Sequence, residues 1–184
     1  LFRSIAVMNE NYPQPSLPEA VHAGVLRGMY RFTEHSLEHA AGRVRLLGSG
    51  AILREVIAAS ELLANEWQVE SEVFSVTSFS ELARDARDAQ RAGRCAKAGV
   101  AASYVQQCLG GSAPIVAASD YVRAWPQLIA EYLSAPYVTL GTDGFGRSDT
   151  RQQLRRFFEV DRFSIVLASL HSLVQNGSLA PSVL

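Results

Sequence analysis

The sequence predicts an α/β fold with three layers, in which helices cover both faces of a mainly parallel, mixed sheet. The first observation is that short apolar runs alternate with helical patterns of about 10–15 residues from residue 43 onward, which is typical of a parallel sheet. The second is that Leu46–Gly48 and Ile115–Ala118 are apolar without alternation, as in strands that are buried on both faces.

Composition favours one well-packed domain. The chain has 184 residues, and single domains hold roughly 100 to 200. Hydrophobic residues make up 48% of the chain, charged residues make up 19%, and the net charge is -1. These values argue against disorder, a nucleic-acid surface and a membrane surface. We therefore expect no nucleic-acid partner and, because no run approaches about 18 apolar residues, no membrane span.

The beginning of the sequence and its cysteines indicate a cytoplasmic fragment. The sequence begins at Leu1, in the middle of an apolar run, and has no initiator methionine. We therefore expect the chain to be cut from a longer protein. The first residues lack the pattern of a signal peptide. Cys95 and Cys108 have no CxxC spacing and cannot form a disulfide framework, which favours reduced thiols in the cytoplasm.

Residues 1–43 are expected to be irregular apart from a short helix over 19–30. Pro13, Pro15 and Pro18 lie close together, and proline continues neither a helix nor a central strand. We interpret residues 1–43 as an N-terminal arm or interdomain linker and residues 44–184 as the α/β domain.

Four strands are expected in the domain, each rich in β-forming residues or ended by glycine or serine. They cover residues 44–50, 72–79, 114–119 and 137–141.

Helices are expected between and after these strands. Apolar residues at helical spacing predict one over 52–63, and Ser78 with Glu81 forms a capping box that opens the next. In a later helix, Tyr121, Trp125, Leu128 and Tyr132 are expected on one face. The remaining helical patterns cover residues 100–109, 120–133, 151–158 and 161–175.

The loop after the last predicted strand is the first candidate site, because ligands of open α/β sheets bind at the carboxyl ends of strands. Its glycines let the backbone approach a ligand, Arg147 could pair with an anion, and Asp143 or Asp149 could bind a cation. The alternative is a plain turn with Asp149 as helix N-cap, and the GxxGxG spacing favours it. The loop consists of Gly141, Thr142, Asp143, Gly144, Phe145, Gly146, Arg147, Ser148 and Asp149.

Other candidate sites have plainer explanations. Gly48-Ser49-Gly50 could hold a phosphate but suits a tight turn between strand and helix. Ser75–Asp85 is rich in hydroxyls, and helix capping explains Ser78 and Glu81. His35 and His39 could present two metal ligands on a helix, but nothing completes the site and a solvated surface is favoured. We therefore expect no catalytic residue and no metal site in this chain.

A series of motifs in fixed order resembles the C-terminal part of the homodimeric pyruvate dehydrogenase component, the first enzyme of the bacterial pyruvate dehydrogenase complex. The resemblance covers nearly the whole chain, and its two long motifs, SVTSFSELARD and LGTDGFGRSD, are quite specific. The matching segments are Met8–Tyr12, Pro15–Glu19, Leu46–Gly50, Ile52–Arg54, Ser75–Asp85, Ser119–Tyr121, Leu140–Asp149 and Phe158–Asp161.

The resemblance implies a transketolase-like subunit of three α/β domains. The first two bind thiamine diphosphate and magnesium across a dimer interface, and the third, matched here, supports the dimer. Such an enzyme decarboxylates pyruvate and reductively acetylates a lipoyl group carried by the next component, the lipoyl acetyltransferase.

The family's cofactor motif, which begins with GDG and ends near a pair of asparagines, is missing from this sequence. We therefore expect the isolated chain to bind no cofactor and to be inactive, with a second subunit and the acetyltransferase component as partners of the full-length enzyme. The Gly141–Asp149 loop is expected at the subunit interface or the active-site rim.

One stretch departs from the family. Ala86–Val100 lacks the tryptophan and the His-Pro step that usually follow, which leaves a related enzyme for another 2-oxo acid, such as 2-oxobutyrate, as an alternative. A non-catalytic interaction module is a second alternative. A free-standing binding domain that uses the Gly141–Asp149 loop as an anion cradle is a third.

Overall fold

The computed structural model describes residues 11–12, 15–95 and 101–184, with the side chain of Cys95 excepted. Within them, five strands form one sheet in the order β1–β3–β2–β4–β5. The strands are β1 (Met29–His35), β2 (Gly42–Ser49), β3 (Val69–Val76), β4 (Ile115–Ala118) and β5 (Tyr137–Leu140). All neighbouring pairs are parallel except β1 and β3, so the predicted mainly parallel, mixed sheet is confirmed.

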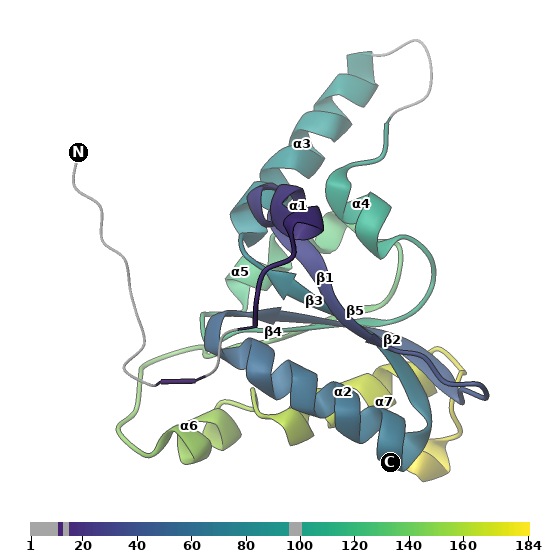
Figure 1. The fold of residues 1–184 in the computed structure, drawn as a ribbon, viewed down its shortest axis with the longest axis vertical. Coiled ribbons are helices and arrows are strands. Elements are labelled where there is room, and N and C mark those ends of the chain that lie inside the picture. The colour runs from purple at the N-terminus through teal and green to yellow at the C-terminus, as the bar shows by residue number, and fades with distance from the viewer. Residues whose placement is uncertain (1–10, 13–14, 96–100) are drawn as a thin grey trace.

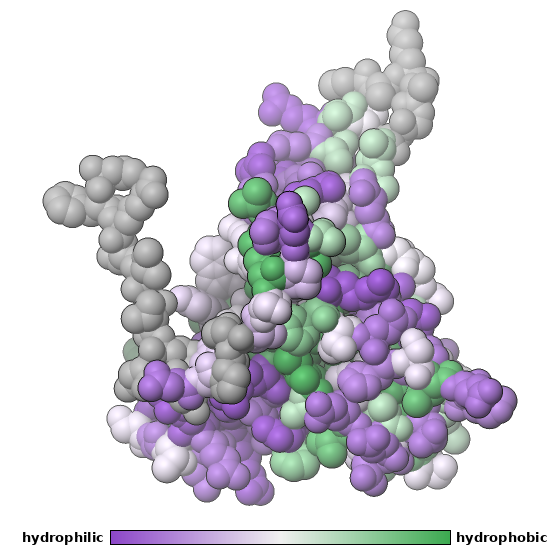
Figure 2. All heavy atoms as spheres, in the orientation of Figure 1, coloured by the Kyte–Doolittle hydropathy of each residue, from purple (hydrophilic) through white to green (hydrophobic). Residues whose placement is uncertain are grey.

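Helices cover both faces of the sheet, which confirms the predicted layers (Figure 1). On one face lie α2 (Leu53–Trp67) and α7 (Arg162–Gln175). On the other lie α3 (Phe79–Cys95), α4 (Tyr104–Leu109), α5 (Ala124–Gln127) and the short turn η3 (Ala130–Tyr132). In the space-filling view, hydrophobic residues gather in the middle of the molecule, between the two helical layers (Figure 2).

Strand β2 is buried on both faces. Val44 and Leu46 point into the core beneath α2 and α7, whereas Leu47 points into the core beneath α3 and α4, and all three are fully buried. Each such side chain stabilises the fold by roughly 1.5–3 kcal/mol relative to exposure. The apolar runs without alternation are therefore explained by burial on both sides of the sheet.

Strand β1 was missed, because Met29–His35 follows a proline-rich segment and mixes apolar with charged residues. It pairs antiparallel with β3 at the edge of the sheet, and the Tyr104 hydroxyl donates to the carbonyl of Met29 at 2.9 Å. The expectation of irregular structure was wrong for residues 29–35, and also for residues 42–43, which begin β2. The predicted short helix is present as η1 (Glu19–Val21) and α1 (His22–Arg27).

The single helix predicted over 120–133 was also wrong, since only α5 and η3 form there. Ser119 Oγ accepts a hydrogen bond from the Tyr121 N–H, and the Tyr121 carbonyl accepts one from Thr142, so the first residues are held in a loop. The residues expected to form one apolar face do not pack together in the core, because Tyr121 and Trp125 are about half exposed whereas Tyr132 is buried.

The other predicted helices are present. α4 begins later than expected, after a capping box between Ser103 and Gln106. α6 (Arg151–Phe157) and α7 match their predicted ranges closely, and short turns η2 (Gly50–Ile52) and η4 (Pro181–Val183) complete the described part.

Leu63→Ala should lower the free energy of unfolding by about 2–5 kcal/mol, because Leu63 of α2 is fully buried and its removal leaves a cavity. Leu26→Ala in α1 is the matched control, since that side chain is 81% exposed and its loss should cost less than about 0.5 kcal/mol. Urea unfolding measures both, and equal losses would contradict the assignment of the core.

Candidate functional site

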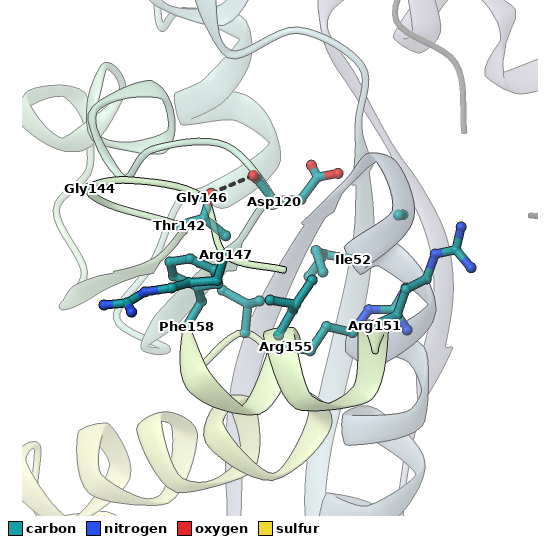
Figure 3. Close-up of a pocket in the computed structure, with 12 residues that line it drawn as sticks. Ile52, Asp120, Thr142, Gly144, Gly146, Arg147, Arg151, Arg155 and Phe158 are labelled. Carbon is teal, nitrogen blue, oxygen red and sulfur yellow. Dashed lines mark hydrogen bonds between the residues drawn. The ribbon is translucent and has the colours of Figure 1, made fainter. Parts of the chain in front are cut away.

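The carboxyl ends of β2, β4 and β5 meet at one edge of the sheet, as parallel pairing requires (Figure 1). The loops that follow them, together with α6, line an open cavity of about 500 Å³ (Figure 3). Ala51 and Ile52 line it from the β2 side, Asp120 from the β4 side and Thr142 from the β5 side. This edge is where the sequence placed the Gly141–Asp149 loop.

The first residues of this loop are joined to the loop after β4. The Thr142 hydroxyl donates to the Asp120 carbonyl at 2.5 Å, and the Thr142 N–H donates to the Tyr121 carbonyl at 2.9 Å. Asp143 accepts hydrogen bonds from the backbone N–H and the guanidinium of Arg123, which lower the pKa of its carboxyl group. The carboxylate of Asp143 thus joins two loops and is engaged by Arg123.

The remaining residues of the loop, 144–149, are exposed. Phe145 is 95% exposed, and the guanidinium of Arg147 lies over the ring of Phe157, 4.9 Å from its centre. Asp149 accepts from the N–H of Thr150, and Thr150 itself caps α6 by accepting from Gln153. The alternative with Asp149 as the N-cap is therefore wrong by one residue.

A buried carboxylate that the sequence analysis missed holds α6 and α7 beside the cavity. Glu55 in the first turn of α2 is 6% exposed. It accepts hydrogen bonds from Arg155 Nη1 at 3.1 Å and from Arg162 Nε at 3.0 Å, and from the Arg162 backbone N–H at 3.1 Å. Burial alone would raise the pKa of Glu55, but the hydrogen bonds and positive charge of Arg162, with Arg155, lower it overall.

The other glycine and serine candidates have the structural roles that the plainer explanations predicted. A Cβ on Gly48 would lie 2.7 Å from Leu53 Cα, so glycine permits the close approach of β2 and α2. Gly50 has a φ of +57° and makes the turn into the helix. Ser78 Oγ accepts from the Glu81 N–H at 3.1 Å at the start of α3.

The histidines and cysteines form no metal site within the described residues. His35 ends β1 and His39 lies in the following turn, so the two do not share a helix. No three His, Cys, Asp or Glu side chains of the described part lie close enough to hold a metal ion. Burial raises the pKa of the Cys108 thiol, which disfavours the thiolate, and the Cys95 side chain lies outside the described residues.

No helix in the described part of the chain is both long enough and apolar enough to span a membrane.

Comparison with known proteins identifies the family to which the chain belongs. Residues 28–161 match the model of the transketolase-like TK C-terminal domain. The chain is 46% identical over its whole length to the "Pyruvate dehydrogenase E1 component" of Pseudomonas aeruginosa, of which it covers 21%. The proteins of the same name are 42% identical in Escherichia coli K12, over 97% of the chain, and 41% identical in Mycobacterium tuberculosis, over 100%.

Solved transketolases share the fold at low sequence identity. A Pichia stipitis transketolase superposes with a TM-score of 0.61 at 14% identity, covering 91% of this chain and 21% of that one. The enzyme from Leishmania mexicana superposes with a TM-score of 0.57 at 19% identity, covering 83% and 19%. The chain spans about a fifth of the length of the curated relatives that it matches.

Glu55→Gln should lower the free energy of unfolding by about 2–3 kcal/mol at pH 7, because it replaces the charged acceptor of the hydrogen bonds from Arg155 and Arg162. The folded-state pKa of Glu55 lies below 4.5, so its contribution is full above that pH and is lost as the pH falls through the folded value. The difference between wild type and variant should therefore shrink below pH 4.5.

Glu66→Gln, at an exposed position of the same helix, is the control and should cost less than about 0.5 kcal/mol. Urea unfolding at a series of pH values measures the difference for each variant. A Glu55→Gln variant as stable as wild type at pH 7 would show that the network does not hold α6 and α7.

Proposed function

Because this chain belongs to the family of transketolase-like C-terminal domains, we propose that it is the C-terminal domain of a thiamine-diphosphate-dependent pyruvate dehydrogenase. The observation that carries the proposal is the identity of 46% over the whole chain to a protein named as a pyruvate dehydrogenase E1 component. The parent enzyme would decarboxylate pyruvate and reductively acetylate the lipoyl group of the acetyltransferase component. We expect it in the cytoplasm.

The described residues do not fit magnesium, which together with thiamine diphosphate is the cofactor set proposed for the parent. Magnesium prefers several oxygen ligands, usually including carboxylates. At the carboxyl edge, Asp143 is engaged by Arg123 and Asp149 by the Thr150 N–H, and no acidic or histidine cluster of the described part could hold a metal ion. We therefore propose that the cofactors bind to the rest of the parent polypeptide, and we derive no catalytic step for this chain.

We propose that this domain supports the dimer and that its Gly141–Asp149 loop faces the subunit interface or the active-site rim. Two large aromatic side chains support this placement, since Phe145 is 95% exposed and Phe157 is 58% exposed. Exposed apolar residues in one place are typical of surfaces that contact another protein or domain. The proposed partners are a second subunit and the lipoyl acetyltransferase component.

A related dehydrogenase for another 2-oxo acid is the second candidate, because Ala86–Val100 departs from the family's usual sequence. Ala86 is buried in the core, residues 87–94 form the largely exposed end of α3, and residues 96–100 lie outside the described residues.

The parent enzyme should acetylate a lipoyl domain when supplied with pyruvate, thiamine diphosphate and magnesium. Its kcat/KM should be higher for pyruvate than for 2-oxobutyrate, measured side by side with the same lipoyl domain. A higher value for 2-oxobutyrate would favour the second candidate, and no acetylation with either acid would reject both.

Arg147→Ala in the parent enzyme should raise the dimer dissociation constant or lower kcat/KM by about fivefold, which corresponds to about 1 kcal/mol. The reason is that the change removes a guanidinium that lies over Phe157 at the exposed rim. Arg156→Ala, an exposed arginine of α6 outside the cavity lining, is the matched control and should change neither quantity. Ultracentrifugation and steady-state kinetics measure both, and unchanged values for Arg147→Ala would reject this placement of the loop.

A further inference from the structure

We propose that strand β5 pairs edge to edge with β5 of a second copy of this chain, so that the sheets of the two copies become continuous. This proposal specifies the surface through which the domain would support a dimer, and it rests on that part of the proposed function.

Strand β5 lies at one edge of the sheet and pairs only with β4. The Leu140 carbonyl accepts from the Ser119 N–H at 3.1 Å, and alternation along the strand places the N–H and carbonyl of Val138 on the same side. Tyr137 and Thr139 therefore direct their backbone groups away from the sheet. No residue of the described part forms a hydrogen bond with these outward groups.

The two edges of the sheet differ in how they are protected. Strand β1, at the opposite edge, carries Arg31 and Glu34, which form an ion pair at 3.0 Å, and its register with β3 shifts between Arg31 and Thr33. Charged side chains and bulges of this kind discourage the addition of another strand. Strand β5 reads Tyr-Val-Thr-Leu, with no charge, no proline and an unbroken register with β4. It is therefore the edge that is suited to strand addition.

Exposed apolar side chains flank this edge. The Tyr137 hydroxyl donates to the Pro126 carbonyl at 2.7 Å, which holds α5 against β5. Beside that contact, Trp125 and Leu128 remain 47% and 38% exposed. On the side of α6, Phe157 is 58% exposed and lines a cavity of about 280 Å³ at the end of the strand. Apolar groups beside an unpaired strand are typical of a surface that contacts another protein.

A second copy would satisfy the backbone of this edge completely. A twofold axis through Val138 places Tyr137 opposite Thr139 of the second copy, and each such pair exchanges two hydrogen bonds in an antiparallel arrangement. All outward groups of both strands are then bonded, and the two Val138 residues face each other at the axis. The contact is isologous, because both copies use the same patch.

The described residues that precede β1 reach the domain at the other edge of the sheet. Tyr12, Pro15 and Leu17 line a cavity together with Tyr30 and Phe32 of β1. Strands β3, β2 and β4 lie between β1 and β5, so the two edges are roughly 19 Å apart. The polypeptide therefore enters the domain far from β5, which favours a second copy as the occupant of this edge.

Sedimentation equilibrium of the 184-residue chain tests the pairing, and the wild type should dimerise with a dissociation constant below about 100 μM. Thr139→Pro should raise that constant at least about tenfold, because proline removes an outward N–H from each copy. The variant should fold, since the bonds to β4 use Val138 and Leu140. Thr139→Val, which keeps the N–H and the shape of the side chain, is the matched control and should dimerise as wild type does. Thermal melting checks the folding of both variants.

The outcomes separate this pairing from the proposed function. Equal dimerisation of wild type and folded Thr139→Pro would overturn the pairing but leave a dimer through another surface. A wild-type chain that is monomeric at about 100 μM would also overturn it. Acetylation of the lipoyl domain by the parent enzyme tests the proposed function independently of either result.

Val138→Cys gives a second test that does not depend on the proline variant. Facing residues at such an axis have Cα atoms about 4.5 Å apart, which a disulfide can span. Oxidised glutathione should therefore convert the two thiols into a disulfide that links the copies. Leu26→Cys, at an 81% exposed position of α1, is the control, because it retains the same native cysteines. No more linked dimer for Val138→Cys than for Leu26→Cys would contradict the pairing.

Discussion

The burial of β2 on both faces, between two parallel neighbours, is the constraint on which the rest of the structure depends. Leu46 and Leu47 point into opposite cores, and each core needs its own layer of helices. The connections from β2 and β3 must therefore cross the sheet on different faces. That requirement produces the three layers, and it also separates the loops at the carboxyl edge.

The residues at the carboxyl edge of the sheet are positioned by contacts that begin at β2. Gly48 brings α2 close to β2, and the first turn of α2 carries Glu55 into contact with Arg155 and Arg162. The buried carboxylate of Glu55 thus links the central strand, through α2, to α6 and α7. On the other side, Thr142 and Asp143 bind the loop after β5 to the loop after β4. The backbone of this edge is held by the protein itself, while Asp120, Phe145 and the end of the Gly141–Asp149 loop face outward.

Much of the fold could be predicted because its signals are local. The apolar runs of β2 and β4 and the helical spacing of α2 and α7 each lie within a short window of sequence. Strand β1 could not be predicted in the same way, since it lies at the edge of the sheet and its residues alternate irregularly between buried and exposed. The single helix expected over 120–133 does not form, because hydrogen bonds from the loop after β5 hold the first residues of this range in another conformation.

The location of the candidate site could be predicted from the sequence, but the interactions within it could not. The position of the Gly141–Asp149 loop followed from the order of strand and helix. The partners of Glu55 lie 100 and 107 residues away, and the partner of Asp143 lies 20 residues away, so no local pattern indicated them.

We propose that these residues form a scaffold whose chemistry belongs to the rest of a longer enzyme. The most direct test of this proposal is the release of carbon dioxide from pyruvate by the 184-residue chain, supplied with thiamine diphosphate, magnesium and an electron acceptor. We expect release no faster than with the cofactor alone. Release that depends on the chain and saturates with pyruvate would contradict it.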